Sequence, residues 1–123
     1  MLFAPRVFAI AAIYGILALL PLYFAEPLLN QLFPPAITHP EFYYAFLGVA
    51  LAWQVAFVLI AREPARLRPI MLPAVLEKLG YGLALLTLFA SGRLPAMAIG
   101  TAIGDLLFAV LFFIAWRKTP EPD

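Results

Sequence analysis

The sequence has no cysteine, a single histidine and few charged residues, and each shortage excludes a class of function. Without cysteine the chain can form no disulfide, thiolate metal site, haem attachment or cysteine nucleophile. With His39 alone, a histidine metal cluster or a Ser-His-Asp triad is hard to build. The net charge of +1 gives no reason to expect a nucleic-acid partner. We therefore expect no metal site, single out no catalytic residue and favour a non-enzymatic protein.

Hydrophobic residues dominate instead. They make up 65% of the 123 residues and charged residues only 12%, whereas about a quarter of the residues in a soluble domain are charged. Because a membrane-crossing helix takes about 20 residues, we predict one all-α membrane domain over residues 1–123, an integral four-helix bundle. Its predicted spans cover residues 7–24, 41–61, 70–90 and 95–116. The lipid bilayer is thus the first expected partner.

The segments between the spans differ in character. Residues 26–40 are rich in proline, which cannot continue a membrane helix, although residues 28–33 are apolar enough for a short helix in the headgroup region. The start of the third span is open, at Ile70 or Pro73. Pro95 occupies the expected first position of the fourth helix. The first span has no small-x-small cleavage site, which favours an uncleaved helix over a signal peptide.

The distribution of basic residues predicts the orientation. One side of the predicted topology carries Arg6, Arg62, Arg66, Arg68, Arg117 and Lys118. The other side carries only Arg93, and Lys78 lies within a span. Short loops rich in Lys and Arg stay in the cytoplasm. We expect a multi-pass protein with both termini cytoplasmic and one longer loop, the proline-rich one, outside.

Several polar residues lie within the predicted spans. They are Tyr14, Gln54, Glu77, Lys78, Tyr81, Thr101 and Asp105. An ionised side chain at mid-bilayer costs roughly 2.5 to 3.5 kcal/mol, so it needs a reason. At about 1.5 Å per residue, Gln54, Glu77 and Lys78 lie roughly 10 to 12 Å from the cytoplasmic end and Asp105 roughly 16 Å. We predict that all four helices contribute to one polar band.

The partners within this band follow from helix geometry. Glu77 and Lys78 are sequence neighbours that point about 100° apart, so we expect each to need a partner of its own. Lys78 leans toward the cytoplasmic end, and the simplest expectation is that it snorkels to the interface. Glu77 is shorter and is expected to face the interior, one turn from Tyr81. There Gln54, Tyr14 or a loop arginine, Arg66 or Arg68, would meet it.

Asp105 lies in a segment with two glycines, Gly100 and Gly104, four residues apart. This spacing forms a smooth groove that lets another helix approach closely, so we predict a helix-packing face there. Thr101 lies one turn before Asp105 and could donate a hydrogen bond to it. An ion pair between Lys78 and Asp105 is disfavoured because the two side chains lean in opposite directions.

Two stretches carry a resemblance to a known family. They are Pro40-Glu41-Phe42-Tyr43-Tyr44-Ala45-Phe46-Leu47-Gly48 and Arg68-Pro69-Ile70-Met71-Leu72-Pro73-Ala74-Val75-Leu76-Glu77-Lys78-Leu79, followed later by Gly104-Asp105. With four short helices and a proline-rich loop, the chain resembles the broad DoxX/BphX-like group of small bacterial membrane proteins. The resemblance implies a bacterial inner-membrane location and, for some relatives, a part in redox complexes that use quinone. It transfers no catalytic residue.

Three functions remain open from the sequence. The first is an accessory or assembly subunit of a membrane complex, or a homo-oligomer, that uses the Gly100/Gly104 face. The second is an intramembrane binding site or redox-accessory site for a lipid-like or quinone-like molecule, lined by the polar band. The third is a small transporter in which Asp105 carries protons. The polar residues can also be structural, as interhelical hydrogen bonds of about 0.6 to 2 kcal/mol each that fix the register of the helices.

Overall fold

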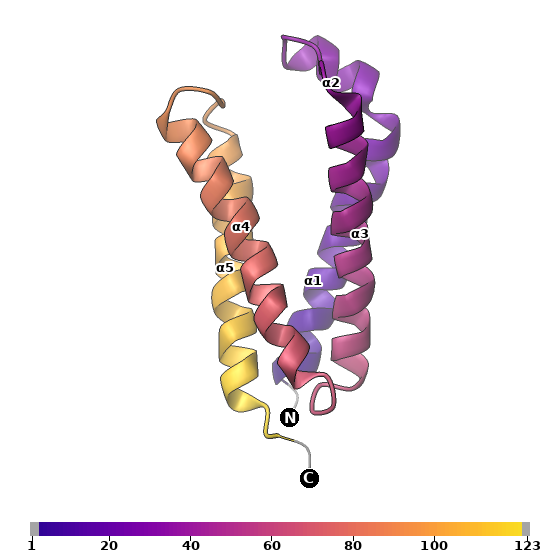
Figure 1. Ribbon diagram of the computed structural model, residues 1–123, viewed down its shortest axis with the longest axis vertical. Coiled ribbons are helices and arrows are strands. Elements are labelled where there is room, and N and C mark those ends of the chain that lie inside the picture. The colour runs from indigo at the N-terminus through magenta and orange to yellow at the C-terminus, as the bar shows by residue number, and fades with distance from the viewer. Residues whose placement is uncertain (1–2, 122–123) are drawn as a thin grey trace.

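The computed structural model describes residues 3–121, which fold into two helical hairpins arranged as a V (Figure 1). The first hairpin contains α1 (Phe3–Leu19), the 3-10 helix η1 (Leu20–Phe24), the short α2 (Glu26–Leu32) and α3 (Pro40–Arg62). The second contains the 3-10 helix η2 (Arg68–Ile70), α4 (Met71–Ala90) and α5 (Ala98–Lys118). Helix α1 packs mainly on α3 and α4 mainly on α5, while α1 also meets α5. We call the end of the V where α1 begins and α5 ends the closed end, and the other the open end.

Four segments of the described chain are long and apolar enough to cross a membrane. They cover Phe3–Phe24, Pro40–Arg62, Arg68–Ala90 and Ala98–Lys118. The predictions of an all-α protein and of four membrane-spanning helices are therefore confirmed at the level of length and composition. The short helix predicted over residues 28–33 is present as Glu26–Leu32.

Prolines lie near several helix boundaries. Two boundaries, the start of α1 and the start of α5, differ from the prediction. Pro21 lacks the N–H that would continue α1 beyond Leu19, so the chain tightens into η1. Pro73 is tolerated in the first turn of α4, where backbone N–H groups have no intrahelical partner. Pro5 is tolerated in the same way, so the described chain is helical from Phe3 and not only from residue 7. Pro95 does not begin α5, because a tight turn closed by an Ala98 N–H to Pro95 C=O hydrogen bond of 3.0 Å precedes it.

The main apolar core lies at the closed end. Phe8 of α1, Phe57 of α3 and Phe112 of α5 are fully buried there, with Phe8 and Phe112 stacked at 4.2 Å between ring centroids. Met71 and Ala74 complete the cluster from α4. In lipid such contacts stabilise through van der Waals packing, since apolar chains gain little by leaving one apolar medium for another. All four long helices are therefore joined at this end.

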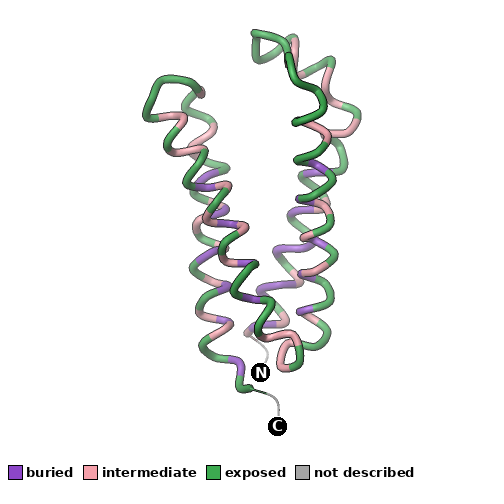
Figure 2. The backbone as a smooth tube through the Cα atoms, viewed as in Figure 1, coloured by how far each residue is buried: buried purple, intermediate pink, exposed green. Residues whose placement is uncertain are grey.

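The open end lacks a core of this kind. Its buried cluster, Leu19, Leu47 and Ala50, belongs to the first hairpin alone. Buried segments accordingly concentrate toward the closed end, while most of the backbone at the open end is exposed or intermediate (Figure 2). The two hairpins separate above the phenylalanine layer, and this separation positions the site described below.

Arg68 connects the segment before α4 to the end of α5 at the closed end. Its Nε donates hydrogen bonds to the backbone oxygens of Trp116, at 3.1 Å, and Thr119, at 2.6 Å. Its guanidinium also lies 4.5 Å from the centroid of a Trp116 ring. These bonds satisfy carbonyl groups that the end of α5 would otherwise leave without partners. The loop before α4 is thereby held against the end of α5.

Candidate functional site: a charged cavity between the hairpins

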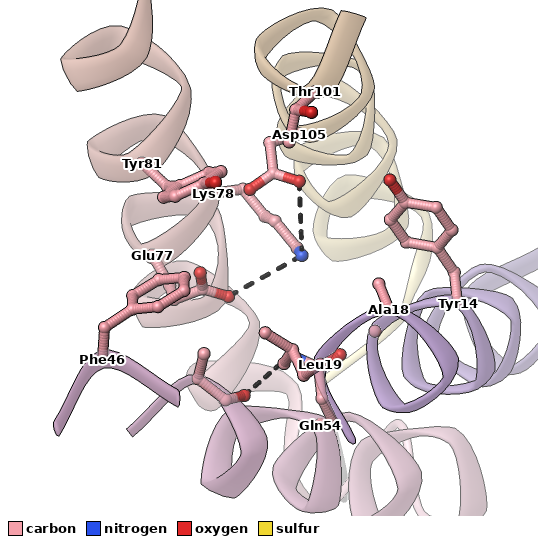
Figure 3. A pocket seen from close by; sticks show the side chains of 12 residues that line it. Tyr14, Ala18, Leu19, Phe46, Gln54, Glu77, Lys78, Tyr81, Thr101 and Asp105 are labelled. Carbon is pink, nitrogen blue, oxygen red and sulfur yellow. Dashed lines mark hydrogen bonds and ion pairs between the residues drawn. The ribbon is translucent and has the colours of Figure 1, made fainter. Parts of the chain in front are cut away.

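A cavity of about 90 Å³ lies where the two hairpins separate. All seven residues of the predicted polar band line it: Tyr14, Gln54, Glu77, Lys78, Tyr81, Thr101 and Asp105. Figure 3 shows these side chains converging from the two arms of the V. Helical rise alone placed Gln54, Glu77, Lys78 and Asp105 at similar depths, and the structure adds that all seven residues surround one space.

Lys78 occupies the centre of the group and is only 4% exposed. Its Nζ lies 3.8 Å from Asp105 Oδ1 and 3.9 Å from Glu77 Oε1 (Figure 3). The same Nζ lies 5.4 Å and 5.6 Å from the ring centroids of Phe57 and Phe108, within the range of cation–π attraction. The expectation that Lys78 snorkels to the interface is therefore wrong. The expectation that Lys78 and Asp105 do not pair is also wrong, because the flexible four-carbon stem of Lys78 lets its ammonium reach α5.

Glu77 finds its cation in its sequence neighbour. The two residues were expected to need separate partners; the long Lys78 side chain nevertheless places Nζ within ion-pair range of Glu77 Oε1, at a distance too long for a hydrogen bond. The loop arginines serve other groups: Arg66 pairs with Glu63 at 3.0 Å, and Arg68 binds the end of α5. Glu77 Oε1 is buried and has no hydrogen-bond partner among the described residues.

Gln54 contributes the second buried oxygen without a hydrogen-bond partner in the described chain. Its Nε2 donates to the backbone oxygen of Ala50 at 2.8 Å, which fixes the amide so that Oε1 is the free acceptor. The side chain rests on the bare backbone of Gly15, where a Cβ would collide with it. Gly15 thus permits a buried glutamine at the α1–α3 contact.

The predicted roles of Thr101 and of the two glycines differ from the arrangement observed. Thr101 lines the cavity, but no hydrogen bond joins it to Asp105 among residues 3–121. A Cβ added at Gly100 would have nothing within 4 Å, and one at Gly104 would meet only the Tyr14 hydroxyl, at 3.9 Å. The close approach of α5 to α4 occurs instead at Gly82, where a Cβ would lie 2.8 Å from Leu106 Cγ. The Gly100/Gly104 face is therefore not used for packing within this chain.

Aromatic residues form much of the remaining wall. Phe46 stacks on Tyr81 at 5.4 Å between centroids, and Tyr14 lies at 5.8 Å from Phe108. The phenylalanines were not among the site residues predicted from the sequence. Their common depth with Gln54 and Lys78 was the available signal, but apolar residues occur at every depth of such helices, so depth could not single them out.

The cavity continues into an apolar groove between α3 and α4. A hollow of about 260 Å³ shares Phe46, Ala50, Glu77 and Tyr81 with the cavity and adds Val49, Trp53 and Gly80. A further hollow of about 310 Å³ shares Val49 and Trp53 and extends toward Ile70. Of the three charged residues, only Glu77 lines both the cavity and the groove. A charged pocket thus opens sideways, toward the space that lipid tails occupy.

This arrangement has a limited chemical range. With both acids ionised, two carboxylates share one ammonium, and the group carries one net negative charge. The described residues contain no cluster of three or more His, Cys, Asp or Glu side chains that could hold a metal ion. The cavity can order a few waters or a small polar group, and the groove can hold an alkyl chain.

Comparisons with protein-family models, with curated proteins and with solved structures return no match to this chain.

Proposed function

We propose that this chain is an intramembrane binding protein for an amphiphilic, lipid-like molecule. The polar end of the ligand would occupy the cavity around Lys78, and its apolar tail would lie in the α3–α4 groove. The continuity of a buried charged cavity with an apolar groove supports this proposal most directly. A purely structural ion-pair network would not require such an opening.

The size of the cavity limits which part of a ligand can enter. Sites that enclose drug-sized molecules measure about 300 to 1,000 Å³, whereas this cavity measures about 90 Å³. A quinone ring would not fit beside Lys78 without movement of the hairpins. A small headgroup would fit, with the tail outside in the groove. The proposal therefore favours a lipid-like ligand over a quinone.

Native mass spectrometry of gently purified protein tests the proposal. Ala18 of α1 lines the cavity and is exposed, so Ala18→Phe places a large side chain at the cavity without replacing a residue of the core. Ala45→Phe is the matched control, because Ala45 is exposed on α3 and does not line the cavity. We expect a bound amphiphile in the unmodified protein and in Ala45→Phe, and its loss in Ala18→Phe. An empty unmodified protein, or a ligand retained equally by all three, would contradict the proposal.

The orientation and location belong to the same proposal. The asymmetry of basic residues supports cytoplasmic termini, with Ser91 and α2 on the outer side. The resemblance to the DoxX/BphX-like group supports the bacterial inner membrane. Because the chain has no cysteine, single cysteines at Ser91 and Glu121 can be labelled unambiguously. A membrane-impermeant maleimide should label Ser91→Cys in intact spheroplasts and Glu121→Cys only after lysis; the reverse pattern would overturn the orientation.

One observation favours a second function, that of an accessory subunit. Gly100 is exposed on α5 with open space where a Cβ would be, so a helix of another chain could approach closely there. Gly100→Leu should then change migration in mild detergent or co-purification. Gly80→Leu is the control, since its Cβ position on α4 is also open. Unchanged assembly of Gly100→Leu would remove this function and leave the binding proposal intact.

A further inference from the structure

The chemistry of the cavity also indicates which headgroup it takes. Resting on the binding function proposed above, we infer that the ligand carries a primary ammonium group on its apolar tail. Three observations carry the inference: the charge of the cavity, the identity of its unpartnered atoms, and the position of Glu77 between cavity and groove.

The charge favours a cation. Lys78 lies nearly midway between Glu77 and Asp105, at 3.9 and 3.8 Å, and hydrogen-bonds neither. With both carboxylates ionised, one ammonium leaves one negative charge, which a second cation would neutralise in a medium where a lone charge is costly. An anionic headgroup such as a carboxylate or phosphate would instead add a second excess negative charge. Anionic lipids are therefore disfavoured as ligands.

The unpartnered atoms favour a hydrogen-bond donor. Both buried side-chain atoms without a hydrogen-bond partner in the described residues, Gln54 Oε1 and Glu77 Oε1, are acceptors. Because Gln54 Nε2 is engaged with the Ala50 carbonyl, the amide cannot turn around to present a donor without breaking that bond. A primary ammonium brings three N–H donors and is about as small as a water molecule. A quaternary ammonium has the charge but no donor, and its three methyl groups must also fit within about 90 Å³.

The position of Glu77 indicates which residue a headgroup would contact first. Its side chain is 19% exposed and lines the groove as well as the cavity, whereas Lys78 and Asp105 line only the cavity. A headgroup arriving along α3 and α4 would reach Glu77 first. Lys78 could then remain with Asp105 while the ligand pairs with Glu77, so that each carboxylate has one ammonium. The aromatic faces of Phe46 and Tyr81 beside Glu77 also suit a cation.

Four probes with the same ten-carbon tail separate these requirements: decylamine, decyltrimethylammonium, decanol and decanoate. Full-length protein in phosphatidylcholine nanodiscs at pH 7 is titrated while the fluorescence of Trp53, which lines the groove, is followed. A Trp53→Phe variant provides the background signal. We expect decylamine to bind at least tenfold more tightly than decanol or decyltrimethylammonium, and decanoate not to saturate.

Variants assign the selectivity to the named acceptors. Glu77→Gln should weaken decylamine at least tenfold and leave decanol within twofold, whereas Glu63→Gln, an exposed acid in a loop, should change neither. Gln54→Leu should weaken decylamine several-fold, and Gln31→Leu, exposed on α2, should not. Using both variants keeps the test valid if one of them misfolds.

A change of lipid identifies the source of the ammonium. If decylamine binds more weakly in phosphatidylethanolamine nanodiscs, the aminophospholipid competes for the site and is the source. If its binding is unchanged, the source is a free amine; both results support the inference.

The outcomes separate this inference from the proposed function. If none of the four probes saturates Trp53, both are overturned. Saturable binding in which decanol or decanoate equals decylamine keeps the binding function and overturns the primary ammonium. Decylamine binding that is indifferent to both Glu77→Gln and Gln54→Leu overturns the inference in the same way, because the acceptors would then have no part in recognition.

Discussion

Replacing Lys78 by methionine tests whether this one ammonium holds the cavity together. Methionine fills much of the space of the lysine stem but leaves Glu77 and Asp105 without a shared cation. At 3.8 Å, one ion pair amounts to about 4 kcal/mol at an effective dielectric constant of 20. Removing one partner of a buried pair costs about 3 to 5 kcal/mol in practice. We therefore expect Lys78→Met to lower the free energy of unfolding by about 3 kcal/mol.

The assay is an SDS titration of the protein in mild-detergent micelles, followed by far-ultraviolet circular dichroism. Lys118→Met is the matched control, because Lys118 is exposed at the end of α5 and lies 4.7 Å from the Phe3 ring centroid. An exposed cation–π contact is worth about 0.5 to 1 kcal/mol, so the control should change stability by no more than that. The comparison isolates burial between carboxylates from the mere loss of a lysine.

The opposite outcome would refute the reasoning. If Lys78 reached the interface in the membrane, its ammonium would not hold the two carboxylates together, and Lys78→Met would change stability no more than Lys118→Met does. A double variant sharpens the test. Asp105→Asn combined with Lys78→Met should be less destabilising than the sum of the two single changes, by about 1 to 3 kcal/mol, since the residues are in contact.

Three further changes test the frame of the site. Arg68→Lys should lower stability in the same titration by about 1 to 3 kcal/mol, because an ammonium cannot reproduce the hydrogen bonds and ring stacking of the guanidinium. Gly15→Ala should cost about 1 to 3 kcal/mol, since its Cβ meets the buried glutamine, whereas Gly80→Ala, in open space, should stay within about 1 kcal/mol. Decylamine should shorten the distance between spin labels at Thr38 and Ser91, measured by double electron–electron resonance; an unchanged distance would mean that the V is rigid.

Much of the architecture could be predicted from local signals. Long apolar runs indicated four membrane helices, and the proline-rich segment that ends at Pro40 marked the connection between the first two. A constant rise per residue placed Gln54, Glu77 and Asp105 at similar depths, and these residues do line one cavity. Each of these inferences uses geometry along a single helix, which the backbone fixes regardless of the neighbouring helices.

The pairing of side chains could not be predicted in the same way. The direction of a Cα–Cβ bond suggested that Lys78 leaves the core, but three rotatable bonds beyond Cβ let its ammonium turn back to Asp105. The glycine spacing on α5 suggested a packing face, but contact between helices also depends on the rotation of each helix, and the close approaches lie at Gly15 and Gly82. The V itself follows from a phenylalanine layer at one end, which no segment reveals alone.

The positions of the two acids explain why stability and binding need not conflict in this site. Asp105 faces Lys78 from α5, away from the groove, and this contact joins the two helices of the second hairpin. Glu77 faces the groove, so it is the acid whose partner can be exchanged. If both carboxylates were equally enclosed, a ligand would have to break the pair that stabilises the hairpin. Because only one of them reaches the groove, the headgroup of the proposed ligand could enter while the Lys78–Asp105 contact remains.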